Sequence, residues 1–229
     1  MRTGIFVQVR LGSTRLRRKA LLPLAGGNVI EHVMRAMAGV PAEVHALLTD
    51  VHSAEALRPF AETEGYAVFP GPAEDVLARY CGACREYDVS RVVRVTGDNP
   101  LTSAALAEDI LSLHALRRPD LSHFLGIPWG MGVEVVEADA MFQAEKDSSL
   151  LEEREHMTTF LYRNRSRFTI LEPRAPARVF LPEARLTVDT QEDYERVKSI
   201  FMALYKGAPI EAEEVIAWIS STSEGAQGV

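Results

Sequence analysis

An apolar segment that runs directly into a cationic loop constrains this chain more than any other feature. Residues 4–7 predict a buried strand, and small, polar and basic residues follow at once over positions 8–19. Five of the 25 Lys and Arg residues fall between positions 10 and 19, although the formal net charge of the 229-residue chain is −7. The loop is therefore a local positive patch at the end of a strand, and it predicts a site for a polyphosphate.

The residue types in this loop suit phosphate binding. Gly12 and Ser13 allow a tight turn that directs backbone amides inward, while Arg10, Arg15 and Lys19 supply charge-assisted hydrogen-bond donors. The loop lacks the Gly-Lys-Ser/Thr ending of a P-loop and the three glycines of a dinucleotide fingerprint. It is therefore a phosphate loop of another kind.

Two carboxylates follow other apolar segments. Residues 91–96 predict a strand that ends before Asp98, and residues 185–188 predict a short strand that ends before Asp189. Adjacent parallel strands would bring both carboxylates to one edge of a sheet, where a bound divalent ion would relieve their repulsion. The alternatives are an ordinary turn at 97–100 and a helix start at Asp189, because Thr190 can cap the next helix.

The cationic loop resembles the first motif of the bacterial cytidylyltransferases that make CMP-activated sugar acids, including the branch of spore-coat polysaccharide synthesis. The chain matches this motif at Gln8, Arg10, Gly12, Ser13, Thr14, Arg15, Leu16 and Lys19. It departs from the family pattern at Arg17, where proline is usual, and at Pro70, where arginine is frequent.

Later segments resemble the same family in the expected order. They are the Gly-Asp-x-Pro turn at 97–100, the glycine-containing segment 129–134, the Arg-Glu-His run at 154–156 and the Leu-Thr-Val-Asp-Thr run at 186–190. The resemblance covers nearly the whole chain. It implies a three-layer α/β, Rossmann-like fold of the nucleotide-diphospho-sugar transferase type.

The resemblance also implies the activity and its residues: transfer of CMP from CTP to an anionic sugar acid, with release of pyrophosphate. Asp98 and Asp189 would hold Mg²⁺, while Arg10 and Lys19 would neutralise charge on the leaving pyrophosphate. The implied nucleotide-binding residues are Gln8, Arg10, Gly12, Ser13, Arg15, Lys19, Arg94 and Asp98. Glu134, at the end of a predicted strand, and His156, in a predicted helix over 152–162, would contact the acceptor.

The alternation of predicted strands and helices indicates one domain over residues 1–220. It loosens after residue 120, so residues 125–180 predict a small inserted α+β lobe, through which we expect a homodimer. Residues 221–229 predict a disordered polar tail.

Composition excludes several other classes of protein. Hydrophobic content is 47%, but no segment approaches the roughly 20 apolar residues of a membrane span. The acidic net charge argues against nucleic-acid binding, and the absence of a signal-peptide pattern predicts the cytoplasm. Cys81 and Cys84 fall inside a predicted helix, which favours packing over a redox role.

Two other functions stay open at this point. Metal-dependent glycosyltransferases use the same fold with an aspartate at a strand end, and a noncatalytic nucleotide-binding protein would also keep the cationic loop. The preference for CTP rests on the resemblance alone.

Overall fold

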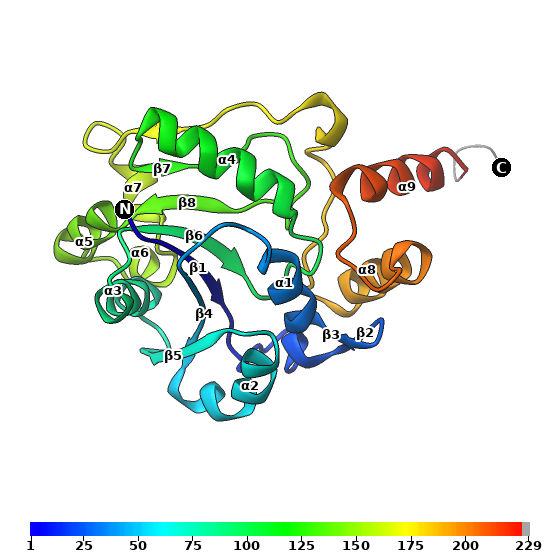
Figure 1. The fold of residues 1–229 in the computed structure, drawn as a ribbon, viewed down its shortest axis with the longest axis horizontal. Helices are drawn as coiled ribbons and strands as arrows, with labels where there is room; N and C mark the ends of the chain where they lie inside the picture. Colours follow the sequence, from blue (N-terminus) through cyan, green and yellow to red (C-terminus); the bar gives the residue numbers. More distant parts are fainter. Residues whose placement is uncertain (226–229) are drawn as a thin grey trace.

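The computed structural model describes residues 1–225 and shows a seven-stranded mixed sheet between two layers of helices (Figure 1). The strand order is β5-β4-β1-β6-β8-β7-β9. Strands β1 (Thr3–Gln8), β4 (Val44–Asp50), β5 (Ala67–Gly71) and β6 (Arg91–Thr96) are parallel neighbours. The predicted three-layer α/β fold is confirmed.

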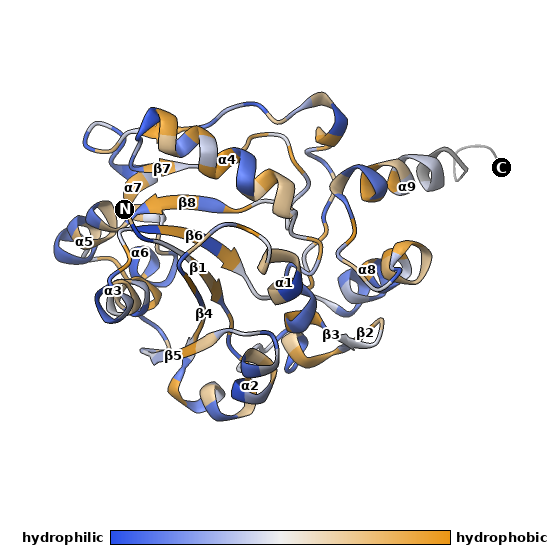
Figure 2. Ribbon diagram, in the orientation of Figure 1, coloured by the Kyte–Doolittle hydropathy of each residue, from blue (hydrophilic) through white to orange (hydrophobic). Residues whose placement is uncertain are grey.

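Strand β1 shows why the sheet is buried on both faces. Its side chains alternate, so that Ile5 and Val7 enter one core while Phe6 enters the other. The first core packs against α1 (Val29–Met37), α2 (Val51–Thr63), α4 (Ala104–Arg117), α8 (Gln191–Leu204) and α9 (Ala212–Gly225). The second packs against α3 (Val76–Tyr87), α5 (Ala138–Asp147) and α7 (Thr159–Arg163). Figure 2 shows hydrophobic residues concentrated in the central strands.

The segment predicted as an inserted lobe contributes to the same sheet. Strand β8 (Glu134–Glu137) pairs antiparallel with β6 and with β7 (Leu121–Ser122), and β7 pairs with β9 (Ile170–Leu171). Glu134 is therefore the first residue of a strand, whereas the sequence predicted it at a strand end.

Pro70 lies inside β5, which tolerates proline because it is an edge strand of the sheet. Two predicted boundaries need correction. Residues 221–225 continue α9 instead of forming a tail, and residues 226–229 lie outside the described residues. The predicted helix over 152–162 is two short helices, α6 (Leu151–Glu155) and α7, with His156 in a non-helical conformation between them.

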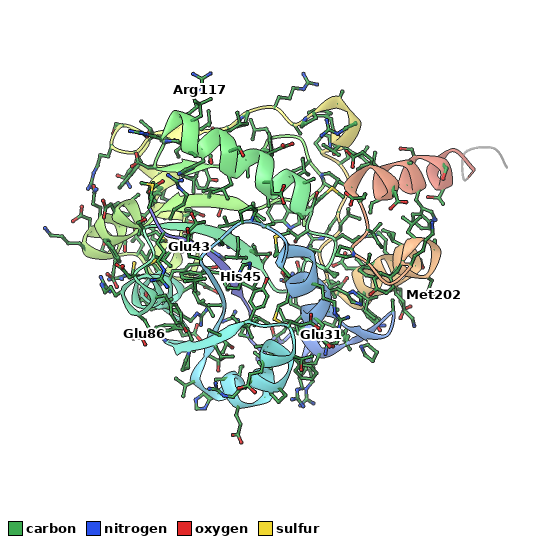
Figure 3. All side chains as sticks on the ribbon, viewed as in Figure 1. Glu31, Glu43, His45, Glu86, Arg117 and Met202 are labelled. Atoms are coloured by element: carbon green, nitrogen blue, oxygen red, sulfur yellow. The ribbon has the colours of Figure 1, made fainter. Side chains whose placement is uncertain are left out.

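Some residues of types that often serve in catalysis are structural here. His45 lies on β4 near the middle of the molecule (Figure 3), and burial lowers its pKa. Cys81 and Cys84 are buried free thiols inside α3, and burial raises the pKa of Cys84 to about 12. A thiol with so high a pKa is a poor nucleophile, which supports the packing interpretation. Among the described helices, none combines the length and apolarity of a membrane span.

Candidate functional site

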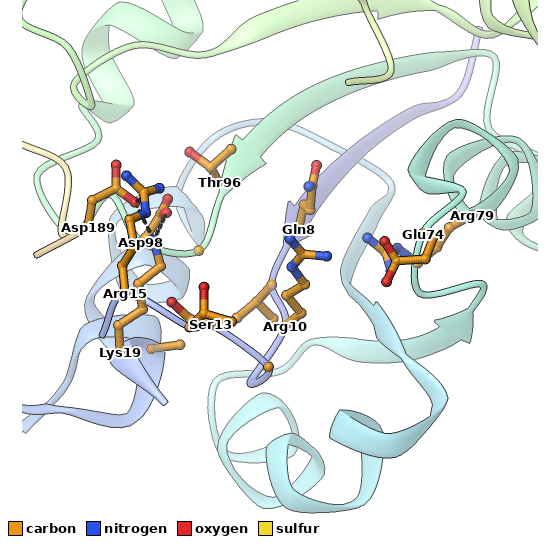
Figure 4. Close-up of a pocket in the computed structure, with 15 residues that line it drawn as sticks. Gln8, Arg10, Ser13, Arg15, Lys19, Glu74, Arg79, Thr96, Asp98 and Asp189 are labelled. Atoms are coloured by element: carbon orange, nitrogen blue, oxygen red, sulfur yellow. Dashed lines mark hydrogen bonds and ion pairs between the residues drawn. The ribbon is translucent and has the colours of Figure 1, made fainter. Parts of the chain in front are cut away.

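A cavity of about 480 Å³ opens at the carboxyl ends of β1 and β6 (Figure 4). The rim also receives the loop after β1, the start of α3 and one residue from the segment before α8. Its lining is Gln8, Val9, Arg10, Gly12, Ser13, Thr14, Arg15, Lys19, Ala20, Glu74, Arg79, Thr96, Gly97, Asp98 and Asp189. All the predicted nucleotide-binding residues except Arg94 therefore lie around one cavity.

Close packing at Gly97 holds the two strand ends together. The Gly97 amide donates to the Gln8 carbonyl at 2.7 Å. A Cβ atom at position 97 would lie 2.8 Å from Val9 and Ile30 side-chain atoms and 3.0 Å from the Gln8 carbonyl oxygen. Only glycine fits this approach, which explains the residue before Asp98 better than turn propensity does.

Lys19 joins the two predicted metal ligands. Its Nζ atom lies 2.5 Å from Asp98 Oδ2 and 2.6 Å from Asp189 Oδ1. These three side chains are largely buried, with exposures of 14% for Lys19, 25% for Asp98 and 14% for Asp189. One lysine thus binds two carboxylates at the position where a cation between them would sit.

The route that brings Asp189 here differs from the prediction. Residues 186–188 are not a strand of the sheet. The Val188 amide donates a hydrogen bond to the Asp98 carbonyl at 2.9 Å, and the Leu186 amide donates one to the Trp129 carbonyl. Asp189 is placed by an extended segment that crosses the rim and ends at the capping box of α8. The predicted parallel strand is wrong, but the two carboxylates still converge.

Several cations surround Asp189. Burial alone would raise the pKa of this carboxyl, but the hydrogen bond and charge of Lys19 and the charges of Arg15 and Arg185 outweigh burial and lower it. Arg185 Nη2 lies 2.5 Å from Oδ2, and Arg15 Nη2 lies 3.2 Å from Oδ1. Asp189 is therefore ionised at neutral pH, as a metal ligand must be.

The donor set suits a magnesium ion carried by a nucleotide. Among the described residues, no group of three or more His, Cys, Asp and Glu side chains is placed to hold a metal. Mg²⁺ is commonly held by one or two carboxylates, with phosphate and water oxygens completing the octahedron. Asp98 and Asp189 fit that arrangement.

The loop after β1, which lines the first cavity, contains backbone amides that make no hydrogen bond within the described fold. Within residues 1–225, no acceptor bonds the amides of Gly12, Ser13 and Thr14. Gly12 has open space where a Cβ would stand and does not adopt a positive φ, so neither packing nor backbone conformation requires glycine at this position. Arg10 pairs weakly with Glu155 at 3.6 Å, with both side chains half exposed.

A second cavity of about 650 Å³ adjoins the first and shares Thr96, Asp98 and Asp189 with it. The predicted acceptor contacts Glu134 and His156 both line this second cavity, together with Trp129. Arg94, predicted to bind the nucleotide, lines it too. The structure therefore places Arg94 at the second cavity and not at the one lined by the predicted phosphate loop.

Glu134 is held by a network of donors. Arg94 Nη1 lies 2.7 Å from Oε2, Tyr162 Oη donates to Oε1 at 2.8 Å, and Thr158 Oγ1 donates at 3.2 Å. Burial and the adjacent Glu134 carboxylate raise the pKa of Tyr162. His156 is exposed and has no hydrogen-bond partner for its ring among the described residues.

Arg79 and Glu74 also line the first cavity, and neither was predicted as a site residue from the sequence. Arg79 lies on α3 and is only 1% exposed, yet it has no ion-pair partner in the described chain. Its position between Val76 and Tyr80 on the buried stripe of α3 was a usable signal, because an arginine on an apolar face requires a partner. Nothing in the sequence marked Glu74.

Comparison with known proteins agrees with this geometry. A family model described as cytidylyltransferase matches residues 5–216. The spore coat polysaccharide biosynthesis protein SpsF of Bacillus subtilis is 28% identical over 227 residues, which is 96% of this chain and 95% of that protein. An uncharacterised protein of Methanocaldococcus jannaschii is 30% identical over 191 residues, covering 82% of this chain and 79% of that protein.

Solved structures show the same arrangement of elements. A cytidylyltransferase from Leptospira borgpetersenii superposes with a TM-score of 0.91 at 26% identity, over 100% of this chain and 98% of that one. A CMP:2-keto-3-deoxy-manno-octonic acid synthetase complexed with CTP gives a TM-score of 0.69 at 16% identity, over 89% and 99%. The second likeness is one of fold.

Proposed function

Because the chain belongs to the cytidylyltransferase family, we propose that it transfers CMP from CTP to a hydroxyl of a sugar acid, releases pyrophosphate and uses Mg²⁺. The product would feed the synthesis of a surface polysaccharide, as the name of the Bacillus subtilis relative suggests. The observation that carries the proposal is the pair of adjoining cavities, which meet at Asp98 and Asp189.

The two cavities support in-line transfer. The acceptor hydroxyl oxygen bonds to the α-phosphorus and loses its proton to the solvent, while the bond from that phosphorus to the bridging oxygen breaks and pyrophosphate leaves with the electron pair. Catalysis of this kind is mostly positioning and charge neutralisation. Bound Mg²⁺ would neutralise phosphate charge between the two carboxylates.

The chain's own residues supply the rest. The free amides of residues 12–14 and the guanidinium of Arg10 would bind the phosphates. Lys19 would move from the two carboxylates to the leaving pyrophosphate, where its ammonium group would neutralise the negative charge that develops. In the second cavity, the exposed ring of His156 is available to the acceptor's carboxylate or hydroxyls.

The first test concerns the carboxylate pair. Asp98→Asn and Asp189→Asn keep side-chain size but remove a charge, so we expect each to lower pyrophosphate release at least about a hundredfold, corresponding to several kcal/mol of lost stabilisation. The double variant should lose little more, because the two carboxylates act as one unit. The assay follows pyrophosphate release from CTP with a panel of sugar acids at several Mg²⁺ concentrations.

Asp147→Asn is the matched control, since Asp147 lies on the surface beside Arg167 and lines neither cavity. If Asp189→Asn releases pyrophosphate at the wild-type rate, Asp189 is not a catalytic carboxylate and only precedes the start of α8. Binding of CTP without pyrophosphate release against any acceptor would indicate a noncatalytic nucleotide-binding protein.

A further inference from the structure

Arg79 is a buried arginine whose hydrogen-bonding capacity is largely unused. Its Nη1 atom donates to the Pro72 carbonyl at 2.9 Å. Its Nε and Nη2 atoms have no hydrogen-bond partner among the described residues. Burial has the largest influence on the pKa of Arg79 and lowers it; Tyr80, Asp50 and Asp75 oppose this effect, and the charge of Arg10 adds to it. A guanidinium in this state lacks acceptors that a ligand could provide.

The fold makes room for this side chain at the wall of the first cavity. A Cβ on Gly71 would lie 2.8 Å from Arg79 Cγ, so the glycine at the end of β5 lets the arginine stem pass. Asp50 is already bonded to Ser53, and Asp75 caps α3, so neither nearby acid pairs with Arg79. The local structure holds the guanidinium in place without giving it an ion-pair partner among the described residues.

The position of Arg79 along the cavity indicates which part of a nucleotide it meets. Figure 4 shows Lys19, Asp98 and Asp189 on one side of Arg10, and Glu74 and Arg79 on the other. The carboxylates mark the end where the α-phosphate must react. The far end, where the Glu74 carboxylate would repel a phosphate, is left for the base.

We propose that Arg79 reads the pyrimidine base and distinguishes cytosine from uracil. This inference rests on the proposed function, because it takes CTP as the nucleotide. A guanidinium only donates hydrogen bonds, and cytosine offers two adjacent acceptors, O2 and N3. In uracil N3 carries a hydrogen, so one bond is lost and two donors face each other. A site built around donors rejects such an analogue strongly.

The test compares dissociation constants for CTP and UTP, measured by calorimetry with Mg²⁺ present, for wild type, Arg79→Lys and Arg85→Lys. Lysine keeps the charge but loses the planar fork. We expect Arg79→Lys to reduce the preference for CTP over UTP at least about tenfold and to leave pyrophosphate binding unchanged. Arg85 lies on the same helix, pairs with Glu145 and lines neither cavity, so its variant should keep the wild-type ratio.

An unchanged CTP to UTP ratio in folded Arg79→Lys would overturn the inference, since a structural or phosphate-binding role would leave that ratio alone. If the variant does not fold, wild type still decides through the triphosphate of 2-pyrimidinone riboside, which keeps O2 and N3 but lacks the amino group. Affinity close to that of CTP supports Arg79 as the reader, and affinity as weak as that of UTP contradicts it. Failure of wild type to bind CTP would instead refute the proposed function.

Discussion

At the scale of single residues, Lys19 has two tasks that compete. In the structure it occupies the space between Asp98 and Asp189, and in the proposed reaction it is needed at the phosphates. The position it holds is also the one that a metal ion between the carboxylates would take. In the proposed reaction, nucleotide and metal would therefore have to displace the ammonium group from the two carboxylates.

We expect Lys19→Met to change metal and nucleotide binding in opposite directions. Removing the ammonium leaves two largely buried carboxylates without their cation, so Mn²⁺ should bind the nucleotide-free protein at least about tenfold more tightly. CTP should bind more weakly, because the triphosphate loses a charge-assisted donor. Manganese binding by electron paramagnetic resonance and CTP binding by calorimetry measure the two effects.

The control is Arg17→Ala, an exposed residue of the same loop that lines neither cavity. Both of its affinities should match wild type. Weaker binding of both ligands by Lys19→Met would show that the lysine supports the carboxylates rather than excluding the ion.

At the scale of elements, strand β8 and the break between α6 and α7 build one side of the second cavity. Glu134 opens β8, and Thr158 and Tyr162 reach it from the start and body of α7. The chain turns at the break at His156, so that the imidazole of His156 is exposed while the side chain of Thr158 is buried. A continuous helix over 152–162 would not give this arrangement.

We expect Glu134 to matter for stability as well as for the predicted contact with the acceptor. Glu134→Gln leaves Arg94 without its carboxylate in a site where the two side chains are 22% and 16% exposed, which should cost about 3 kcal/mol in the free energy of unfolding. Tyr162→Phe removes one hydrogen bond and should cost about 1 kcal/mol. Urea unfolding measures both variants.

Glu195→Gln is the control for this series, because Glu195 is 55% exposed and its only ion pair, with Lys198, spans 3.9 Å in the described structure. Its free energy of unfolding should stay within about 0.5 kcal/mol of wild type. An equally small effect for Glu134→Gln would mean that water replaces the carboxylate beside Arg94.

At the scale of the whole molecule, apolar side chains are exposed on the segment for which we predicted a dimer contact. Leu151 at the start of α6 is 87% exposed and Leu150 beside it 53%. Trp129, at the second cavity, is 67% exposed. The strands of this segment pair within the central sheet, so they do not require a second subunit. The expectation of a homodimer therefore rests on the exposed leucines.

We expect wild type to be a dimer at micromolar concentration and Leu151→Asp to be a folded monomer, because a carboxylate at an apolar contact loses its hydration. Light scattering after size-exclusion chromatography gives the mass of each. Met202→Asp is the control: Met202 is 79% exposed at the outer surface of α8, away from the segment (Figure 3), and should leave the mass unchanged. A monomeric wild type would refute the dimer.

The sequence by itself determined those features of the protein that depend on neighbours along the chain. The alternation in β1, the capping of α8 at Thr190 and the buried stripe of α3 follow from local periodicity and residue type. The resemblance of the motifs led to the family, and the comparisons confirmed it. The roles of the site residues stay predictions.

Only the tertiary structure decided which side chains meet. Lys19 contacts Asp189 across 170 positions of sequence, and Asp189 arrives on a segment that is not a strand of the sheet. Arg94 is turned to Glu134 and the second cavity, and Arg79 is left without an acid at the first. Local patterns cannot specify such contacts, because each is set by the packing of elements distant in the chain, where geometry selects one partner among many residues of the same charge.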